Sequence, residues 1–361
     1  MQAKEKIQRE ATQAIINNNY NGLLISAMRT GKTKIIIDAI RSYVGSILWI
    51  TDKAKLRDEA IPLEIEKWNL NRKIDIICYN SIKNINKKYD LIILDECQRL
   101  SESNYGVIKD KFNDLLACTG TKPNNYKKLE LYEKLELKEI FNLSVDEASS
   151  NKIIADYDID IHYHNLDSKN KNIKVEYKDK KTKENKVFYT TELARYNYIS
   201  LRIEESNAAD NKFLRLNRMR FIGTLPSKEY QVSKYLSENL HKKIIIFCIT
   251  QDQADRLCYN SYHSKSNQDV LDHFKNNLIN HISVVNKIDT GETFTDIDEI
   301  ILVTSNSSNI QSVQRIGRSL MFREGYKAKI KIFCTKDTVE EQWIYKALVD
   351  LSNTKINKIY E

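Results

Sequence analysis

The sequence has few residues that interrupt regular structure, with nine glycines and three prolines among 361 residues. We interpret this scarcity as compositional drift and draw no function from it. No apolar run approaches the roughly 20 residues that span a bilayer. The charged N-terminus, MQAKEKIQRE, also lacks the apolar stretch of a secretion signal. We therefore expect a cytoplasmic protein with no membrane partner.

No two of the six cysteines have CxxC spacing, and most of them lie in apolar, strand-like runs. This pattern is typical of small core residues in a reducing compartment. The histidines are scattered, except that His162 and His164 alternate as on one face of a strand. A metal pair there is one interpretation; a half-exposed strand face is the one we favour.

The chain has enough length and apolar content for two globular domains, with 41% hydrophobic residues. Its formal net charge is +8, from 57 basic and 49 acidic residues. Such an excess suits a polyanionic partner such as nucleic acid, although charge alone is weak evidence.

Short apolar runs alternate with helix-length polar segments. The first series is GLLI, SILWI, KIDIICY, YDLIILD and DLLACTG, and a second is KKIIIFCIT, HISVVNK, EIILVTS and KIKIFCT. Runs of this kind indicate strands buried on both faces of a parallel sheet. The fold class is therefore α/β with two parallel-sheet domains in tandem. We place them at 1–145 and 229–361, with 146–228 as a linker and the entry to the second domain.

The linker differs from both series, because IKVEY and KVFYT alternate around the lysine-rich KDKKTKEN. This pattern predicts an inserted β-hairpin with a charged tip. The tip is either a solvated surface feature or a wedge that faces nucleic acid, since lysines pair with phosphates.

The segment SAMRTGKTK follows the apolar NGLLI and contains the Gly-Lys-Thr of a phosphate-binding loop. Ser26 stands where that pattern has its first glycine, and Arg29 lies inside the loop. Alone, this match is weak. Nucleotide hydrolysis also needs a strand that ends in carboxylates beside the phosphates, and YDLIILDECQ supplies Asp95 and Glu96. The pattern predicts that Asp95 holds Mg²⁺ with Thr33, and that Glu96 orients and deprotonates the attacking water.

The order GKT, DECQ and CTGT resembles the superfamily 2 helicases and translocases of the DExH-like kind, over nearly the whole chain. The resemblance implies two RecA-like domains that bind ATP and Mg²⁺, with Thr30, Gly31, Lys32 and Thr33 in the nucleotide site. QREATQAI looks like the family's glutamine motif, which makes Gln8 either an adenine reader or an exposed helical residue. Further resemblances assign nucleic-acid contacts or coupling between hydrolysis and movement to Thr51, Lys53, Ser81, Thr119, Thr121 and Thr250.

In the second domain, QSVQRIGRSL is similar to motif VI, which assigns transition-state roles to Gln314, Arg315 and Arg318. Arginines suit that role because charge spreads over the γ-phosphoryl oxygens. The segment from Asn286 resembles motif V, with Gly291 in a tight turn. Met321 stands where the family commonly has a further arginine, which implies an effect on hydrolysis rate rather than on nucleotide binding.

The leading interpretation is an ATP-dependent helicase or translocase with weak sequence preference. We expect DNA rather than RNA, because MRTGKT and QRIGR look closer to compact phage or viral helicases, and to Swi/Snf-type translocases, than to DEAD-box proteins. The host cytoplasm is then the compartment if a phage encodes the protein. The alternatives are an RNA helicase, a translocase that does not separate strands, and a non-enzymatic nucleic-acid clamp derived from a motor.

Overall fold

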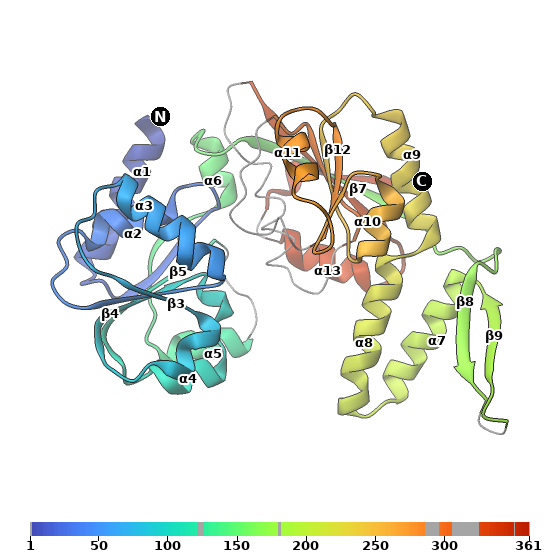
Figure 1. The fold of residues 1–361 in the computed structure, drawn as a ribbon, viewed down its shortest axis with the longest axis horizontal. Helices are drawn as coiled ribbons and strands as arrows, with labels where there is room; N and C mark the ends of the chain where they lie inside the picture. The colour runs from blue at the N-terminus through green and yellow to red at the C-terminus, as the bar shows by residue number, and fades with distance from the viewer. Residues whose placement is uncertain are drawn as a thin grey trace. The chain divides into compact units, whose positions relative to one another are not determined.

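The structure is a computed structural model that describes residues 2–120, 126–179, 182–285, 296–304, 325–349 and 351–360, with 208–210 described by their backbone only. The chain forms two compact units, coloured blue to green and green to red in Figure 1. The first unit extends to Asp156 and the second begins at Tyr157. The segment 146–228, expected as a linker and domain entry, thus contributes its first residues to one unit and the rest to the other.

The first unit is built on a six-stranded parallel sheet in the order β3-β2-β4-β5-β1-β6. Its strands are β1 (Gly22–Ser26), β2 (Ile47–Thr51), β3 (Asp75–Cys78), β4 (Tyr89–Asp95), β5 (Phe112–Thr119) and β6 (Glu139–Leu143). The helices are α1 (Gln2–Asn17), α2 (Lys32–Ile40), α3 (Ile61–Lys67), α4 (Glu102–Ile108), α5 (Tyr126–Lys134) and α6 (Val145–Ser150). Three shorter turns of helix are η1 (Leu56–Ala60), η2 (Tyr79–Asn84) and η3 (Cys97–Arg99).

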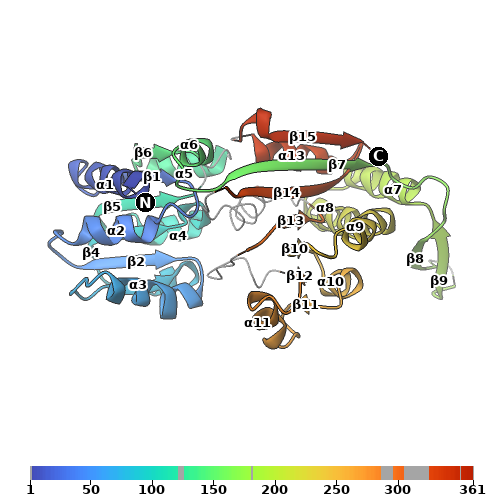
Figure 2. The same cartoon turned by 90° about the horizontal axis from the view of Figure 1, so that it is seen from above.

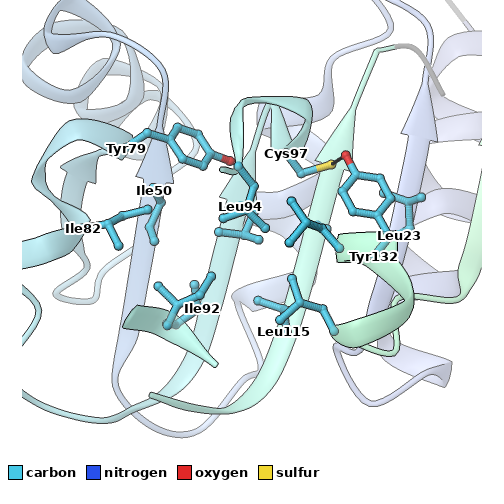
Figure 3. Packing of buried hydrophobic residues seen from close by; sticks show 14 of the residues in the cluster. Leu23, Ile50, Tyr79, Ile82, Ile92, Leu94, Cys97, Leu115 and Tyr132 are labelled. Atoms are coloured by element: carbon cyan, nitrogen blue, oxygen red, sulfur yellow. Dashed lines mark hydrogen bonds between the residues drawn. The ribbon is translucent and has the colours of Figure 1, made fainter. Parts of the chain in front are cut away.

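Apolar cores cover both faces of this sheet, because successive strand residues point to opposite sides. In β4, Ile92 and Leu94 join the core that includes Tyr79 and Tyr132 (Figure 3). Leu91 and Ile93 join the other core, with residues of α1, α2 and α3. The continuous apolar runs that predicted buried parallel strands are explained by this two-sided packing.

The second unit contains a seven-stranded sheet in the order β11-β12-β10-β13-β14-β7-β15, and its edge toward β15 is seen clearly in Figure 2. Its strands are β7 (Asp156–His164), β10 (Ile244–Phe247), β11 (Ser261–Tyr262), β12 (His281–Val284), β13 (Glu299–Leu302), β14 (Lys327–Thr335) and β15 (Ile356–Tyr360). Helices around it are α9 (Pro226–Glu238), α10 (Gln251–Leu257), α11 (Asp269–Lys275) and α13 (Val339–Leu348), with the short turn η4 (Asn353–Lys355). Two parallel sheets in one chain confirm the predicted fold class.

Between β7 and α9 the chain forms an insertion that projects from the body of its unit (Figures 1 and 2). The antiparallel strands β8 (Ile173–Lys178) and β9 (Asn185–Thr190) confirm the predicted hairpin. The helices α7 (Glu192–Glu205) and α8 (Ala208–Gly223) follow and pack against each other. The insertion is therefore a β-hairpin joined to a helical hairpin.

The preferred interpretation of His162 and His164 as a half-exposed strand face is wrong, because both side chains are buried. The reason is that β7 lies between β14 and β15 and the His162 ring stacks on Phe333, with centroids 5.1 Å apart. Within the described residues, no group of three His, Cys, Asp or Glu side chains is arranged to hold a metal ion. Of the helices that the structure describes, none is both long and apolar enough to cross a membrane. All six cysteines are free thiols, and five of them are buried.

Candidate nucleotide site

The phosphate-loop segment lies at the carboxyl end of β1, where Ser26 ends the strand and Lys32 begins α2. Gly31 has a φ of 94°, in the left-handed region that favours glycine. A Cβ at this position would lie 2.4 Å from Gln8 Nε2. The first turn of α2 leaves backbone N–H groups without helical partners, and such groups bind phosphate. The strand–loop–helix context that the motif requires is therefore present.

Ser26 replaces the expected glycine and closes the loop through hydroxyl contacts. The Thr30 hydroxyl donates to the carbonyl of Ala27 at 2.7 Å, so the Ser26 hydroxyl donates to Thr30 Oγ1, also at 2.7 Å. Ser26 and Thr30 are both buried. A glycine at position 26 would lack this contact, so the serine contributes to the loop's conformation.

Gln8, the proposed adenine reader, is buried on α1 and not on an exposed helix face. Its Nε2 donates to the Thr30 carbonyl at 2.8 Å, and Lys4 Nζ donates to the Arg29 carbonyl at 2.9 Å. Arg29 has a φ of 67°. Helix α1 therefore holds the phosphate loop by two side-chain contacts to its backbone. The adenine contact of Gln8 stays a prediction.

The Lys32 side chain extends from α2 toward the end of β4. Its Nζ donates to the Ser26 carbonyl at 3.3 Å and lies 3.9 Å from Glu96 Oε1. Both side chains are mostly buried, with exposures of 12% and 21%. Electrostatic attraction is stronger at such a site than at an open surface.

Asp95 and Glu96 place two carboxyl groups side by side where β4 ends. Burial and, after it, the neighbouring Glu96 charge raise the pKa of Asp95 to about 7, against the opposing effect of Lys32. Negative charge here is therefore incompletely compensated, which favours a bound cation. Mg²⁺ takes oxygen ligands, usually one or two carboxylates together with substrate phosphates. Asp95 and the Thr33 hydroxyl, on the first turn of α2, fit that donor set.

Gln98 joins the carboxylates to the next strand, and sequence reasoning gave this residue no role. The Thr119 hydroxyl donates to Gln98 Oε1 at 2.8 Å, and Gln98 Nε2 donates to Glu96 Oε2 at 2.5 Å. Gln98 and Thr119 are buried. This chain of contacts orients the Glu96 carboxylate from the end of β5. The only signal in the sequence was the position of Gln98 in DECQ.

A second residue missed from the sequence is Tyr79, two positions before Ser81. Its hydroxyl donates to the Asp95 carbonyl at 3.0 Å, and its ring lies in the core (Figure 3). Burial raises the pKa of this phenol well above its ordinary value, so it remains a hydrogen-bond donor. Tyr79 therefore fixes the backbone at the end of β4.

Of the residues predicted to contact nucleic acid, Thr51, Lys53 and Ser81 belong to the first unit and Thr250 to the second. Thr51 ends β2 and is fully buried, whereas Lys53 and Ser81 are partly exposed. Thr250, in the second unit, caps α10 by accepting from the Gln253 backbone N–H at 3.2 Å. Their contacts with nucleic acid stay predictions, and for Thr51 a side-chain contact would require exposure of a buried hydroxyl.

Five predicted site residues and the motif VI departure at Met321 lie outside the described residues. The five are Thr121, Gly291, Gln314, Arg315 and Arg318. The other predicted nucleotide-site residues, together with Thr119, belong to the first unit and come from α1, the loop after β1, the start of α2, and the ends of β4 and β5. They are Gln8, Thr30, Gly31, Lys32, Thr33, Asp95, Glu96 and Thr119.

No protein-family model and no curated protein matches the sequence. Solved structures do match it. The ATP-dependent Type ISP restriction-modification enzyme LlaBIII, bound to DNA, matches with a TM-score of 0.63 and 14% identity, over 98% of this chain and 31% of that one. The present chain thus spans about a third of the length of that enzyme.

Two further structures match over most of their own length. Saccharomyces cerevisiae Dbp5, bound to RNA and ADP BeF3, has a TM-score of 0.56 and 12% identity, over 98% of this chain and 89% of that one. The Pyrococcus furiosus Hef helicase domain has a TM-score of 0.51 and 14% identity, over 95% and 97%. At these identities the likeness concerns the fold. The chain has a fold of two RecA-like domains in tandem, like these structures.

Proposed function

We propose that this chain is a nucleic-acid-stimulated ATPase that couples ATP hydrolysis to movement on DNA, as a helicase or a translocase. The observation that carries the proposal is the 3.9 Å approach of Lys32 Nζ to Glu96 Oε1, between a phosphate-type loop and a DExx-type strand end. A cation and an acidic pair at the carboxyl edge of a parallel sheet are what a nucleotide triphosphate with its metal requires.

The proposed roles follow from the side chains. Gly31 allows close backbone approach and Lys32 pairs with the phosphates, while Thr33 and Asp95 hold Mg²⁺, which neutralises phosphate charge when bound. Glu96, held by Gln98, orients and deprotonates the attacking water. We assign Arg315 and Arg318, assisted by Gln314, to the charge that develops on the γ-phosphoryl group. Thr119 and Thr121 would couple hydrolysis to movement.

DNA is the proposed partner, in a replication, recombination or repair process of phage or viral type. The fold similarity to LlaBIII, which is bound to DNA, supports this choice, whereas Dbp5 is bound to RNA. Contacts through the phosphate backbone predict weak sequence preference and strong salt dependence.

The test is ATPase activity measured side by side with single-stranded DNA, duplex DNA, forked DNA and RNA. We expect stimulation by DNA, abolished in Lys32→Ala. Stronger stimulation by RNA would favour an RNA helicase. Triplex displacement without unwinding of a fork would favour a translocase. Absence of stimulated hydrolysis, together with unchanged nucleic-acid binding in Lys32→Ala, would instead favour a clamp.

A further inference from the structure

The insertion between β7 and α9 carries most of the net charge of the chain. Residues 165–223 contain 14 basic and 8 acidic side chains, a net charge of +6 out of the total of +8. In the rest of the chain, basic and acidic side chains are therefore almost equal in number. A positive charge gathered in one projecting segment marks a surface for a polyanion.

Helix α8 presents part of this charge along a groove that it forms with α13. The groove has a volume of about 1040 Å³. Its walls bear cationic and aromatic side chains, including Lys212, Phe213, Arg215 and Leu216 of α8, with Trp343 and Lys346 of α13. Residues three and four apart on a helix share a face, so both helices contribute a continuous wall. All of these residues belong to the second unit.

The cations of this groove are not neutralised by neighbours that the structure describes. Lys212, Arg215 and Lys346 form no ion pair with a described residue, and no acidic side chain is among the described residues of the walls. By contrast, Lys228 in the same unit is paired with Glu340. Uncompensated cations that face one another across a groove attract an anion between them.

The exposed side chain of Phe213 favours single-stranded nucleic acid as the anion that this groove binds. Phe213 is 65% exposed, and Lys212 and Arg215 flank it in the sequence and line the same groove. An aromatic ring exposed in this way leaves apolar surface in contact with water, which burial would remove. Bases of single-stranded nucleic acid stack on exposed rings while their phosphates pair with adjacent Lys and Arg. Duplex bases are already stacked and are not available to such a ring.

We propose that the α8–α13 groove binds a single strand of nucleic acid, with phosphates on Lys212, Arg215 and Lys346 and a base stacked on Phe213. This inference rests on the proposed function, because it adds a strand-binding surface to the motor. None of the predicted contact positions Thr51, Lys53, Ser81 and Thr250 lines this groove. The insertion thus supplies a grip on the strand in addition to those positions.

The experiment measures binding of a short fluorescent oligothymidylate by anisotropy, without nucleotide and across a salt series. Arg215→Gln should reduce the slope of log affinity against log salt by about 0.7, the value for one phosphate contact on a single strand. Phe213→Ala should weaken binding about tenfold with the slope unchanged, since stacking is not a charge contact. Phe213→Trp should restore the affinity.

The matched control is Lys234→Gln, an exposed lysine on α9 that lies outside the groove and should leave affinity and slope unchanged. Circular dichroism and thermal unfolding check that each variant is folded. Wild-type affinity and slope in both Arg215→Gln and Phe213→Ala would overturn the proposal, and so would an equal loss of affinity for blunt duplex in Phe213→Ala. If these variants lose binding while wild type shows no stimulated ATPase, the groove stands and the motor function fails. If DNA stimulates the ATPase of the wild-type protein but the variants bind the oligonucleotide normally, the motor function stands and the groove proposal fails.

Discussion

The ammonium group of Lys32 lies 3.9 Å from the carboxylate of Glu96, although 63 residues separate them in the sequence. The two side chains come from the start of α2 and the end of β4, which meet at one edge of the first sheet. Lys32 is the predicted phosphate-binding residue and Glu96 the predicted general base, so this contact places the two predicted roles next to each other.

Lys32→Ala and Glu96→Gln should each reduce ATP turnover by about 100-fold or more, because they remove a phosphate-binding charge and a general base. Glu96→Gln should retain ATP, since its amide keeps the shape of the carboxylate. Turnover and nucleotide binding are measured by phosphate release and by equilibrium dialysis. Lys34→Ala is the control, because Lys34 pairs with Asp38 on α2. Wild-type turnover in Glu96→Gln would exclude its catalytic role.

Gln98→Leu should lower kcat about 10- to 100-fold and leave the KM for ATP nearly unchanged, because Gln98 positions Glu96 without reaching the nucleotide. Thr119→Val removes the donor to the same amide. The double variant should therefore lose less than the product of the two single losses. Steady-state kinetics of the four proteins give this coupling. Independent losses would mean that the contacts do not act as a unit.

Gly31→Ala should destabilise the first unit by about 1–2 kcal/mol, because alanine is strained at a φ of 94°. Its methyl group would also displace the amide of Gln8 from the loop. Adding Gln8→Ala to this variant should relieve the loss of stability caused by the clash and leave the loss caused by backbone strain. Urea unfolding of the single and double variants separates the two contributions. Gly106→Ala is the comparison, since a Cβ at that helical glycine meets nothing within 4 Å.

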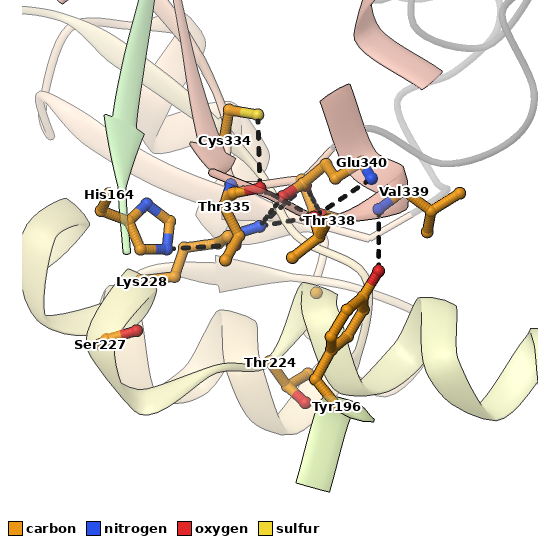
Figure 4. Close-up of polar contacts among 12 residues, drawn as sticks. His164, Tyr196, Thr224, Ser227, Lys228, Cys334, Thr335, Thr338, Val339 and Glu340 are labelled. Carbon is orange, nitrogen blue, oxygen red and sulfur yellow. Dashed lines mark hydrogen bonds and ion pairs between the residues drawn. The ribbon is translucent and has the colours of Figure 1, made fainter. Parts of the chain in front are cut away.

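Glu340→Gln should destabilise the second unit by about 3–5 kcal/mol, the usual loss when one partner of a buried ion pair is removed. Lys228 and Glu340 are fully buried, with Nζ–Oε2 at 2.7 Å, and Glu340 also accepts from the Thr335 backbone N–H at 2.8 Å (Figure 4). Adding Lys228→Met should recover part of the loss. Glu130→Gln, in the surface pair with Lys134, should cost less than about 1 kcal/mol. Equal losses at both pairs would show that burial does not decide the effect.

His164 should make the second unit less stable as the pH falls below about 6.5. Burial and, after it, the nearby Lys228 charge lower the pKa of His164 to about 3. Between about pH 6.5 and 3, the unfolded chain therefore binds a proton that the folded chain does not, so stability decreases as pH decreases. The slope contributed is up to about 1.4 kcal/mol per pH unit.

His164→Gln should remove that slope, whereas His273→Gln, at an exposed position of α11, serves as the control. The Gln amide can keep a hydrogen bond in place of the 3.1 Å contact between His164 Nε2 and Thr335 Oγ1 (Figure 4). Urea unfolding at several pH values gives the slopes. A wild-type slope in His164→Gln would mean that other groups cause the dependence.

Local patterns were enough to predict most of the strands and to select the candidate site residues, whereas β6, β11 and β15 were not predicted. Apolar runs such as Leu91–Leu94 predicted buried parallel strands, because both of their faces need apolar neighbours. The same runs predicted where the strands end, so short motifs selected Lys32, Asp95 and Glu96 as candidates. The hairpin around 179–184 was also found, because alternation and a polar tip are local signals.

The partners of those residues were not predictable, since they come from distant segments. Gln98 acts through Thr119, and Gln8 reaches Thr30 from another helix. The burial of His162 depends on pairing of β7 with β15, nearly 200 residues later.

The sequence alone determined which residues are candidates for the chemistry and in which strands and helices most of them stand, because periodicity and turn residues act locally. Tertiary packing decided which of them are buried, which side chains they contact, and that α8 and α13 enclose a cationic groove. Burial and contact depend on segments far apart in the chain, and no local pattern encodes them.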